Sequence, residues 1–143
     1  MFTVKRITDM ADVLQFVPIE CRLREKEKTP VRTNEFLAFV QSALQNELFY
    51  LVGVYDGADI AGYIAVLVIP INLMDMKSVN ILRVWYDPKY RKTEIRDLGW
   101  QIITEIAKIH GIKKVRFEAR RGIKAYERTW KFKAISTVME RRI

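Results

Sequence analysis

Apolar and polar residues alternate from Phe2 to Ile7, which predicts a β-strand at the start of the chain. Asp9 is a predicted helix N-cap, because its carboxylate can accept a hydrogen bond from a free N–H of the first turn. It precedes a segment whose apolar positions recur at helical spacing. This segment predicts a first helix that carries Ala11, Val13, Leu14, Phe16 and Val17. The polar stretch Arg22–Arg32 then predicts the end of the helix and a loop closed by Pro30.

A second helix is predicted after this loop, with Thr33 or Asn34 as its N-cap. Its apolar positions recur at helical spacing and are Phe36, Phe39, Val40, Ala43 and Leu44.

Three strands are predicted next, over Leu48–Tyr55, Ile60–Ile69 and Val79–Tyr86. The Asp56-Gly57 pair is typical of a hairpin turn between the first two, and Asp87-Pro88 ends the third. Because the middle strand is apolar without alternation, it predicts a central strand that is covered on both faces.

The clearest helical pattern runs from Glu94 to His110, and Gly111 is its predicted stop. Its apolar stripe consists of Ile95, Leu98, Ile102, Ile103, Ile106 and Ile109. The remaining elements are a strand over Lys114–Glu118, a short helix over Ile123–Trp130 and a final strand over Ala134–Met139. This order predicts an α/β (α+β) fold, a mixed, mostly antiparallel sheet with helices on both faces.

The length of 143 residues, 50% of them hydrophobic, predicts one globular domain over residues 1–143. The longest uncharged run, between Asp59 and Asp75, is shorter than the roughly 20 apolar residues of a membrane span. A signal peptide is not expected either, because the N-terminal segment has no apolar core. The single Cys21 cannot form an internal disulfide, which favours a cytoplasmic location. No Cys, His and carboxylate cluster has metal-ligand spacing, so no metal site is predicted.

The net charge of +8 is divided unevenly along the chain. Residues 1–75 hold 7 Lys/Arg and 10 Asp/Glu, whereas residues 76–143 hold 18 Lys/Arg and 7 Asp/Glu. The excess positive charge therefore belongs to the second half, where it fits a phosphorylated cofactor, a polyanionic partner or a solvated surface.

Four segments carry a family pattern: VYDGADIAGYIAV (Val54–Val66), VWYDPKYRK (Val84–Lys92), AYERTWKFK (Ala125–Lys133) and STVMERRI (Ser136–Ile143). Together with the element order, they resemble the GCN5-related N-acetyltransferases, the GNAT superfamily. The second segment, followed by a long amphipathic helix, is the most specific. The resemblance implies a GNAT-like fold in which two parallel strands, residues 79–86 and 114–118, splay apart.

The resemblance also implies that acetyl-CoA binds in the cleft between these two strands. Its pantetheine arm would pair with the backbone around Val84 and Tyr86, and its pyrophosphate would lie at the start of the following helix. The phosphate loop of the family, Arg/Gln-x-x-Gly-x-Gly/Ala, corresponds to Arg91–Arg96, with Glu94 and Arg96 at the two glycine positions.

Two interpretations of this loop are open. In the first, the loop still holds the cofactor, with Thr93 in the site and with Arg91, Lys92 and Arg96 replacing part of the amide cradle. In the second, the loop has lost the cofactor and is a plain helix start, with Thr93 as its N-cap and Glu94 favourable beside the helix N-terminus. The first interpretation is our prediction.

Acetyl transfer needs a base for the amine and an acid for the departing thiolate. In the family, a tyrosine on the short helix after the second splayed strand serves as the acid, and Tyr126 matches it. Phe132 fits the same motif, in which Lys131 replaces a glycine. Glu118, at the end of its strand, is the candidate base. The alternatives are that Tyr126 packs in the core and that Glu118 pairs with a neighbouring arginine.

We therefore expect an acetyl-CoA-dependent N-acyltransferase that acetylates an amine of a small molecule or protein. One alternative is a GNAT-like domain without catalysis, a structural or binding subunit of an assembly such as a virus particle. Another is a basic module associated with nucleic acid. The expected partners are acetyl-CoA and an amine acceptor. A homodimer or larger assembly stays open, nucleic acid is less favoured, and no membrane partner is expected.

Overall fold

The computed structural model describes residues 1–29, 32–71, 77–118, 127–133, 135, 139, 141 and 142. Its centre is a sheet of five strands whose spatial order is the order in the chain. The strands are β1 (Phe2–Ile7), β2 (Phe49–Asp56), β3 (Asp59–Ile69), β4 (Ser78–Tyr86) and β5 (Val115–Phe117). Neighbouring strands are antiparallel except β4 and β5, which are parallel.

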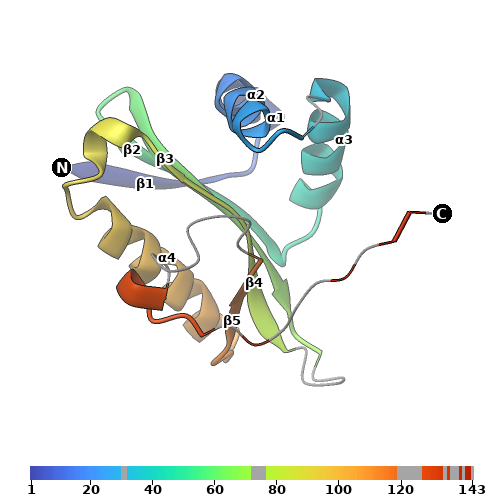
Figure 1. The fold of residues 1–143 in the computed structure, drawn as a ribbon, viewed down its shortest axis with the longest axis vertical. Helices are drawn as coiled ribbons and strands as arrows, with labels where there is room; N and C mark the ends of the chain where they lie inside the picture. The colour runs from blue at the N-terminus through green and yellow to red at the C-terminus, as the bar shows by residue number, and fades with distance from the viewer. Residues whose placement is uncertain are drawn as a thin grey trace.

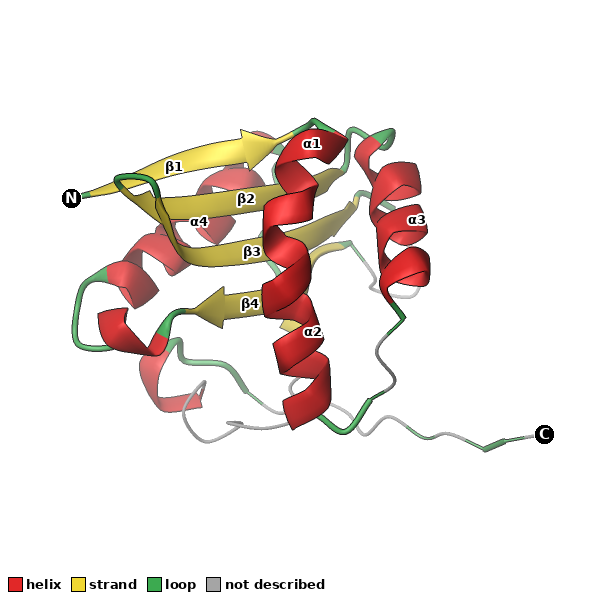
Figure 2. Ribbon diagram, turned by 90° about the horizontal axis from the view of Figure 1, so that it is seen from above, coloured by secondary structure: helices red, strands yellow, loops and turns green. Residues whose placement is uncertain are grey.

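Helices cover both faces of this sheet. The first face carries α1 (Met10–Val13), a 3-10 turn η1 (Leu14–Phe16), α2 (Val17–Lys26) and α3 (Thr33–Leu44). The second face carries α4 (Ile95–Ile109), which follows a 3-10 turn η3 (Pro88–Tyr90). Figures 1 and 2 show α1, α2 and α3 on one side of the strands and α4 on the other. The predicted mixed sheet with helices on both faces is therefore confirmed.

The five strands predicted within residues 2–118 agree with the structure because their signals are local. Gly57 adopts a φ of +61° in the turn between β2 and β3, where only glycine is free of a Cβ penalty. Residues 61–66 of β3 are buried, as expected for a central strand between two helical layers. The predicted stop at Asp87 is also confirmed, since its side chain accepts a hydrogen bond from the Lys89 N–H at 3.1 Å.

A register shift interrupts the pairing of β3 with β4. Ala65 lies opposite Arg83 and Val66 lies opposite Ile81, so Leu82 is an extra residue in β4. Such a bulge bends the strand and changes which face its following side chains reach.

The side chains of β4 follow this change of face. Those that contact the core beneath α4 are Val79, Ile81, Val84 and Tyr86. Trp85 packs instead in the core beneath α1–α3, and Arg83 forms ion pairs with α2. Without the extra residue, successive side chains would alternate strictly between the two faces, and Arg83 and Trp85 would point toward α4.

The helix predictions were correct in place but wrong in several details. Asp9 caps α1 as predicted, because its side chain accepts a hydrogen bond from the Ala11 N–H at 2.9 Å. Neither Thr33 nor Asn34 caps α3: both lie inside the helix, and Arg32 occupies the N-cap without a side-chain bond.

Three large apolar residues of the predicted helical stripes are exposed, and the first of them is Leu14, at 57%. Ile109 of α4 is 71% exposed and Phe39 of α3 is 57% exposed. Ile109 lies in the last turn of its helix, whereas Gly99 and Ala107 of the same helix are buried. The rest of α4 follows the predicted stripe, with Ile95, Ile103 and Ile106 buried. The predicted final strand lies almost entirely outside the described residues.

Two glycines make room for the side chain of Tyr86 at the end of β4. A β-carbon at Gly62 would lie 2.7 Å from the Trp85 carbonyl oxygen and 2.8 Å from Cδ1 of Tyr86. A β-carbon at Gly99, in α4, would overlap the Tyr86 hydroxyl oxygen. The Tyr86 ring thus fills the space between strand and helix, and holds the end of β4 against the start of α4.

We predict that Gly99→Ala lowers the free energy of unfolding by about 1–3 kcal/mol through this overlap. The direction is opposite to the gain of ~1 kcal/mol that alanine normally brings to a helix. Tyr86→Phe removes the hydroxyl, so Gly99→Ala costs less stability when it is added to Tyr86→Phe than when it is added to the wild type. Urea unfolding of the two single variants and the double variant measures this coupling, and strictly additive losses would contradict the proposed contact.

Candidate active site

The parallel pair β4–β5 is short and opens at one end. Its register joins Val79 to Val115, Asn80 to Arg116 and Ile81 to Phe117. Within the described residues, β4 then continues to Tyr86 without a strand partner on this edge, because β5 ends at Phe117. The backbone of this part of β4, which includes Val84, can therefore hydrogen-bond to an extended ligand, as an added strand would.

The predicted phosphate-loop residues lie together just beyond this open edge. Arg91, Lys92 and Thr93 connect the 3-10 turn η3 to α4, and Arg96 is in the first turn of α4; all four are exposed. The first α-helical bond runs from the Leu98 N–H to the Glu94 carbonyl at 3.0 Å, so the amides before it point out of the helix.

The second interpretation of the loop is corrected at its N-cap. Glu94, rather than Thr93, occupies the N-cap of α4, and it makes no side-chain cap bond. The Thr93 hydroxyl donates to the Tyr90 carbonyl oxygen at 2.6 Å and accepts a long bond from the Ile95 N–H at 3.4 Å.

The backbone of this loop does not require glycine. Among the described non-glycine residues, only Lys28 and Lys131 have a positive φ, so residues 91–96 all have negative φ. Glu94 has a φ of −71° and an exposed side chain that can turn toward solvent. Glutamate at the first glycine position therefore adds bulk and negative charge to the loop without straining its backbone.

Of the two candidate catalytic residues, the structure describes only Glu118. Glu118 follows β5 directly and is exposed, as predicted from its place at the strand end. Tyr126 lies outside the described residues. Residues 127–129 are helical, in agreement with the predicted short helix, and Lys131 adopts a φ of +58° where the family pattern has glycine.

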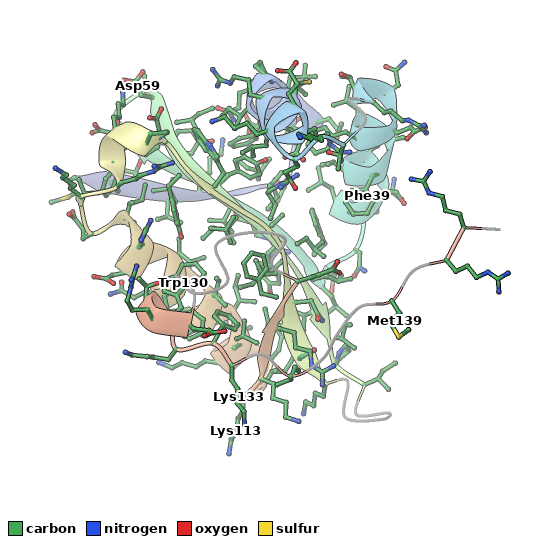
Figure 3. The ribbon with its side chains drawn as sticks, in the orientation of Figure 1. Phe39, Asp59, Lys113, Trp130, Lys133 and Met139 are labelled. Atoms are coloured by element: carbon green, nitrogen blue, oxygen red, sulfur yellow. The ribbon has the colours of Figure 1, made fainter. Side chains whose placement is uncertain are left out.

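An aromatic cluster holds this C-terminal segment on α4. Trp130 is 7% exposed, and its ring centroid lies 5.6 Å from that of Trp100 in α4. Phe132 contacts the same Trp100 ring and also Phe117 at the end of β5, with centroid distances of 5.8 and 6.3 Å. Figure 3 shows Trp130 beside α4. The segment next to Tyr126 is thereby attached at the end of β5, beside the opening.

A buried polar network lies on the opposite face of β4. Glu20 of α2 is only 4% exposed, and Arg83 donates to its Oε1 at 2.5 Å. Arg83 also donates to Oε1 of Glu27 at 2.6 Å, and the Tyr63 hydroxyl donates to Oε2 of Glu20. Arg24 completes the network, with its Nε 3.4 Å from Oε1 of Glu20. The network ties α2 to β3 and β4.

The network controls the ionisation of its members. Burial raises the pKa of the Tyr63 hydroxyl far above its usual range, and the charge of Glu20 adds to this effect. Burial alone would lower the pKa of Arg83, but its hydrogen bonds and ion pairs with Glu20 and Glu27 outweigh burial and raise it. Tyr63 therefore stays a hydrogen-bond donor and Arg83 stays a cation.

Comparison with solved structures places this architecture. A predicted acetyltransferase from Clostridium acetobutylicum, solved with acetyl-CoA, is 18% identical and has a TM-score of 0.82 over 99% of this chain and 96% of its own. A GCN5-related N-acetyltransferase from Ralstonia eutropha is 16% identical, with a TM-score of 0.79 over 100% and 99% of the two chains. The chain has the fold of the GCN5-related N-acetyltransferases.

Solved structures of similar fold include aminoglycoside N-acetyltransferases. An aminoglycoside 6′-N-acetyltransferase from Acinetobacter baumannii is 12% identical, with a TM-score of 0.81 over 100% of this chain and 98% of its own. No protein-family model and no curated protein sequence matches the chain. The relation therefore lies in the fold rather than in the sequence.

The residues of the opening fit the acetyl-CoA that this fold implies. The open edge of β4 can pair with an extended amide chain, and the start of α4 provides outward amides next to Arg91, Lys92 and Arg96. The negative φ of Glu94 shows that the loop adopts its backbone conformation without glycine. Elsewhere in the described residues, no group of three His, Cys, Asp or Glu could hold a metal ion, and no helix could cross a membrane.

Sequence reasoning missed the Glu20–Arg83 network. A signal was present, because Arg83 is the one charged residue in the predicted strand Val79–Tyr86. A charge in a buried strand must find a partner, since an isolated buried charge is very costly. The partner, Glu20, is 63 residues away in the chain, and no local pattern connects the two.

We predict that Tyr63→Phe lowers the free energy of unfolding by about 1.5–3 kcal/mol, because Glu20 loses a charge-assisted hydrogen bond in a buried site. Tyr55→Phe is the matched control: its hydroxyl accepts a neutral, half-buried bond from Gln15 at 3.1 Å, and its loss costs about 1 kcal/mol or less. Urea denaturation of both variants measures the difference, and equal losses would contradict the special role of Tyr63.

Proposed function

We propose that the protein is an acetyl-CoA-dependent N-acyltransferase that moves an acetyl group to an amine of a small molecule or a protein. The observation that carries this proposal is the open edge of β4 beside the start of α4. The neighbours of the same fold support the class of reaction, since one was solved with acetyl-CoA and another is an aminoglycoside N-acetyltransferase.

When bound, acetyl-CoA supplies an activated thioester, and the residues of this chain have three tasks around it. Arg91, Lys92 and Arg96 neutralise the phosphates, together with the outward amides at the start of α4. The backbone around Val84 and Tyr86 orients the pantetheine arm along β4. A base and an acid then manage the two protons of the transfer.

The proton tasks belong to Glu118 and Tyr126 in this proposal. The amine nitrogen forms a bond to the acetyl carbon, the carbon–sulphur bond breaks, and free CoA leaves. Glu118, at the end of β5, accepts the proton of the amine, directly or through water. Tyr126 returns a proton to the departing sulphur, so that charge does not accumulate on the thiolate.

A second candidate function is a GNAT-like domain without catalysis that serves as a binding or structural subunit. The observation that favours it is Glu94 at the N-cap of α4, whose carboxylate would repel a diphosphate approaching the helix start. Binding of acetyl-CoA separates the two candidates, because only the first requires it.

We expect acetyl-CoA and free CoA to bind the wild-type protein, as measured by calorimetric titration. Arg91→Ala weakens binding of both about tenfold, which corresponds to ~1.4 kcal/mol for one lost phosphate contact. Arg22→Ala, at an exposed arginine of α2 on the other face of the sheet, leaves binding unchanged and serves as the control. Absence of binding at millimolar cofactor would refute the enzyme function and favour the noncatalytic subunit.

We expect Tyr126→Phe to lower kcat by at least about 100-fold, the usual contribution of a general acid, with little change in acetyl-CoA binding. Free thiol released in the presence of an acceptor amine measures the turnover. Tyr55→Phe, on β2, is the control and keeps wild-type turnover. If Tyr126→Phe turns over like the wild type, its role as the acid is wrong.

A further inference from the structure

The two faces of the β4 opening carry different charges. On one face lie the start of α4 and the basic loop at residues 91–96, which suits the phosphates of the cofactor. Given the proposed function, on which this inference rests, an acceptor amine approaches from the other face, where α2 crosses the sheet toward β4 (Figure 2). There β4 presents Arg83 and Trp85.

The carboxylates on this acceptor face are neutralised from within the protein. Arg83 donates to Glu20 at 2.5 Å and to Glu27 at 2.6 Å, and the side chains of these glutamates are only 6% and 12% exposed. Carboxylates next to aromatic rings would otherwise form a site for a cationic amine. The guanidinium of Arg83 already occupies that position, so a polycationic acceptor finds no available counter-charge in this group.

The charges that remain exposed near the end of α2 are mostly positive. Arg22, Lys26 and Lys28 are exposed, against one exposed carboxylate, Glu25. Lys28 follows the end of α2 with a φ of +55°, next to Glu27. These cations cannot be neutralised by the cofactor phosphates, which would lie at the start of α4 on the opposite face.

The segment after β5 adds to the positive field. Arg128, Lys131 and Lys133 are exposed there, against Glu118 and Glu127. Figure 3 shows Lys113 and Lys133 at one end of the molecule, on the side where β5 begins and away from the open edge of β4. Fields of one sign around an opening attract ligands of the opposite sign and repel those of the same sign.

We propose that the acceptor is an amine on a molecule that carries carboxylates, as an acidic peptide does, and that Arg83 sets this preference by holding Glu20 and Glu27 in internal ion pairs. Arg83 is thus a specificity residue of the acceptor face, not a catalytic residue. An acidic acceptor gains from the exposed lysines at the end of α2, whereas a polycation is repelled by them.

The test uses three tetrapeptides that share an N-terminal alanine and an amidated C-terminus, and carry two glutamates, two glutamines or two lysines. We expect kcat/KM for thiol release to be highest for the glutamate peptide, about five- to tenfold above the lysine peptide. Calorimetric binding of the same peptides in the presence of free CoA follows the same order, so the test does not depend on turnover.

Two variants that break the same ion pair separate specificity from structure. Arg83→Gln releases two carboxylates and shifts the ratio of glutamate to lysine peptide downward, whereas Glu27→Gln removes one carboxylate and shifts it upward. If Arg83 has only a structural role, both variants lower the activity on all three peptides and leave the ratio of glutamate to lysine peptide unchanged. If Arg83→Gln does not fold, two other variants test the inference. Glu27→Gln raises the ratio of glutamate to lysine peptide, and Lys26→Gln, at an exposed residue, lowers it.

The outcomes also separate this inference from the proposed function. A wild-type preference for the lysine peptide, or a glutamate peptide that neither reacts nor binds, overturns the inference while acetyl-CoA binding stands. Failure of acetyl-CoA itself to bind overturns the proposed function first. Variants that shift the ratio in opposite directions support the inference.

Discussion

The extra residue at Leu82 is the constraint on which the rest of this structure depends. By adding one position to β4, it exchanges the two faces for all that follows, so Val84 and Tyr86 reach the α4 core while Arg83 reaches α2. The extra residue directly follows Ile81, the last residue of β4 that pairs with β5. The ion pairs of Arg83 with α2 and the packing of Tyr86 against α4 both follow from that one insertion.

The buried network around Glu20 keeps the bulged strand in register with α2. Shifting β4 by one residue would remove Arg83 from both Glu20 and Glu27 and leave Glu20 with only the longer contact to Arg24. Breaking a buried pair in this way costs about 3–5 kcal/mol, although the intact pair contributes little net stability. The network therefore acts mainly as a register lock. The same atoms set the charge of the face from which an acceptor would approach.

Sequence patterns predicted the elements whose signals are local and missed features that depend on distant contacts. The hairpin at Gly57, the stop at Asp87 and the end of α4 at Gly111 were correct, because turn and cap chemistry involves neighbouring residues. The cap of α3 was wrong, because several polar residues at the helix start offered the same local signal. Ile109 and Phe39 were wrong, because helical spacing does not reveal where the sheet beneath a helix ends.

By itself, the sequence determined the order of the elements, the division of charge between the two halves, and a phosphate loop in which Glu94 and Arg96 replace glycines. Only the tertiary structure decided that this loop has negative φ throughout, so that its backbone does not need the glycines of the family pattern. Only the tertiary structure joined Arg83 to Glu20 across 63 residues and fitted Tyr86 between Gly62 and Gly99. The physical reason is that periodicity and capping act over a few residues, whereas strand register and ion pairing depend on segments that meet only in the folded chain.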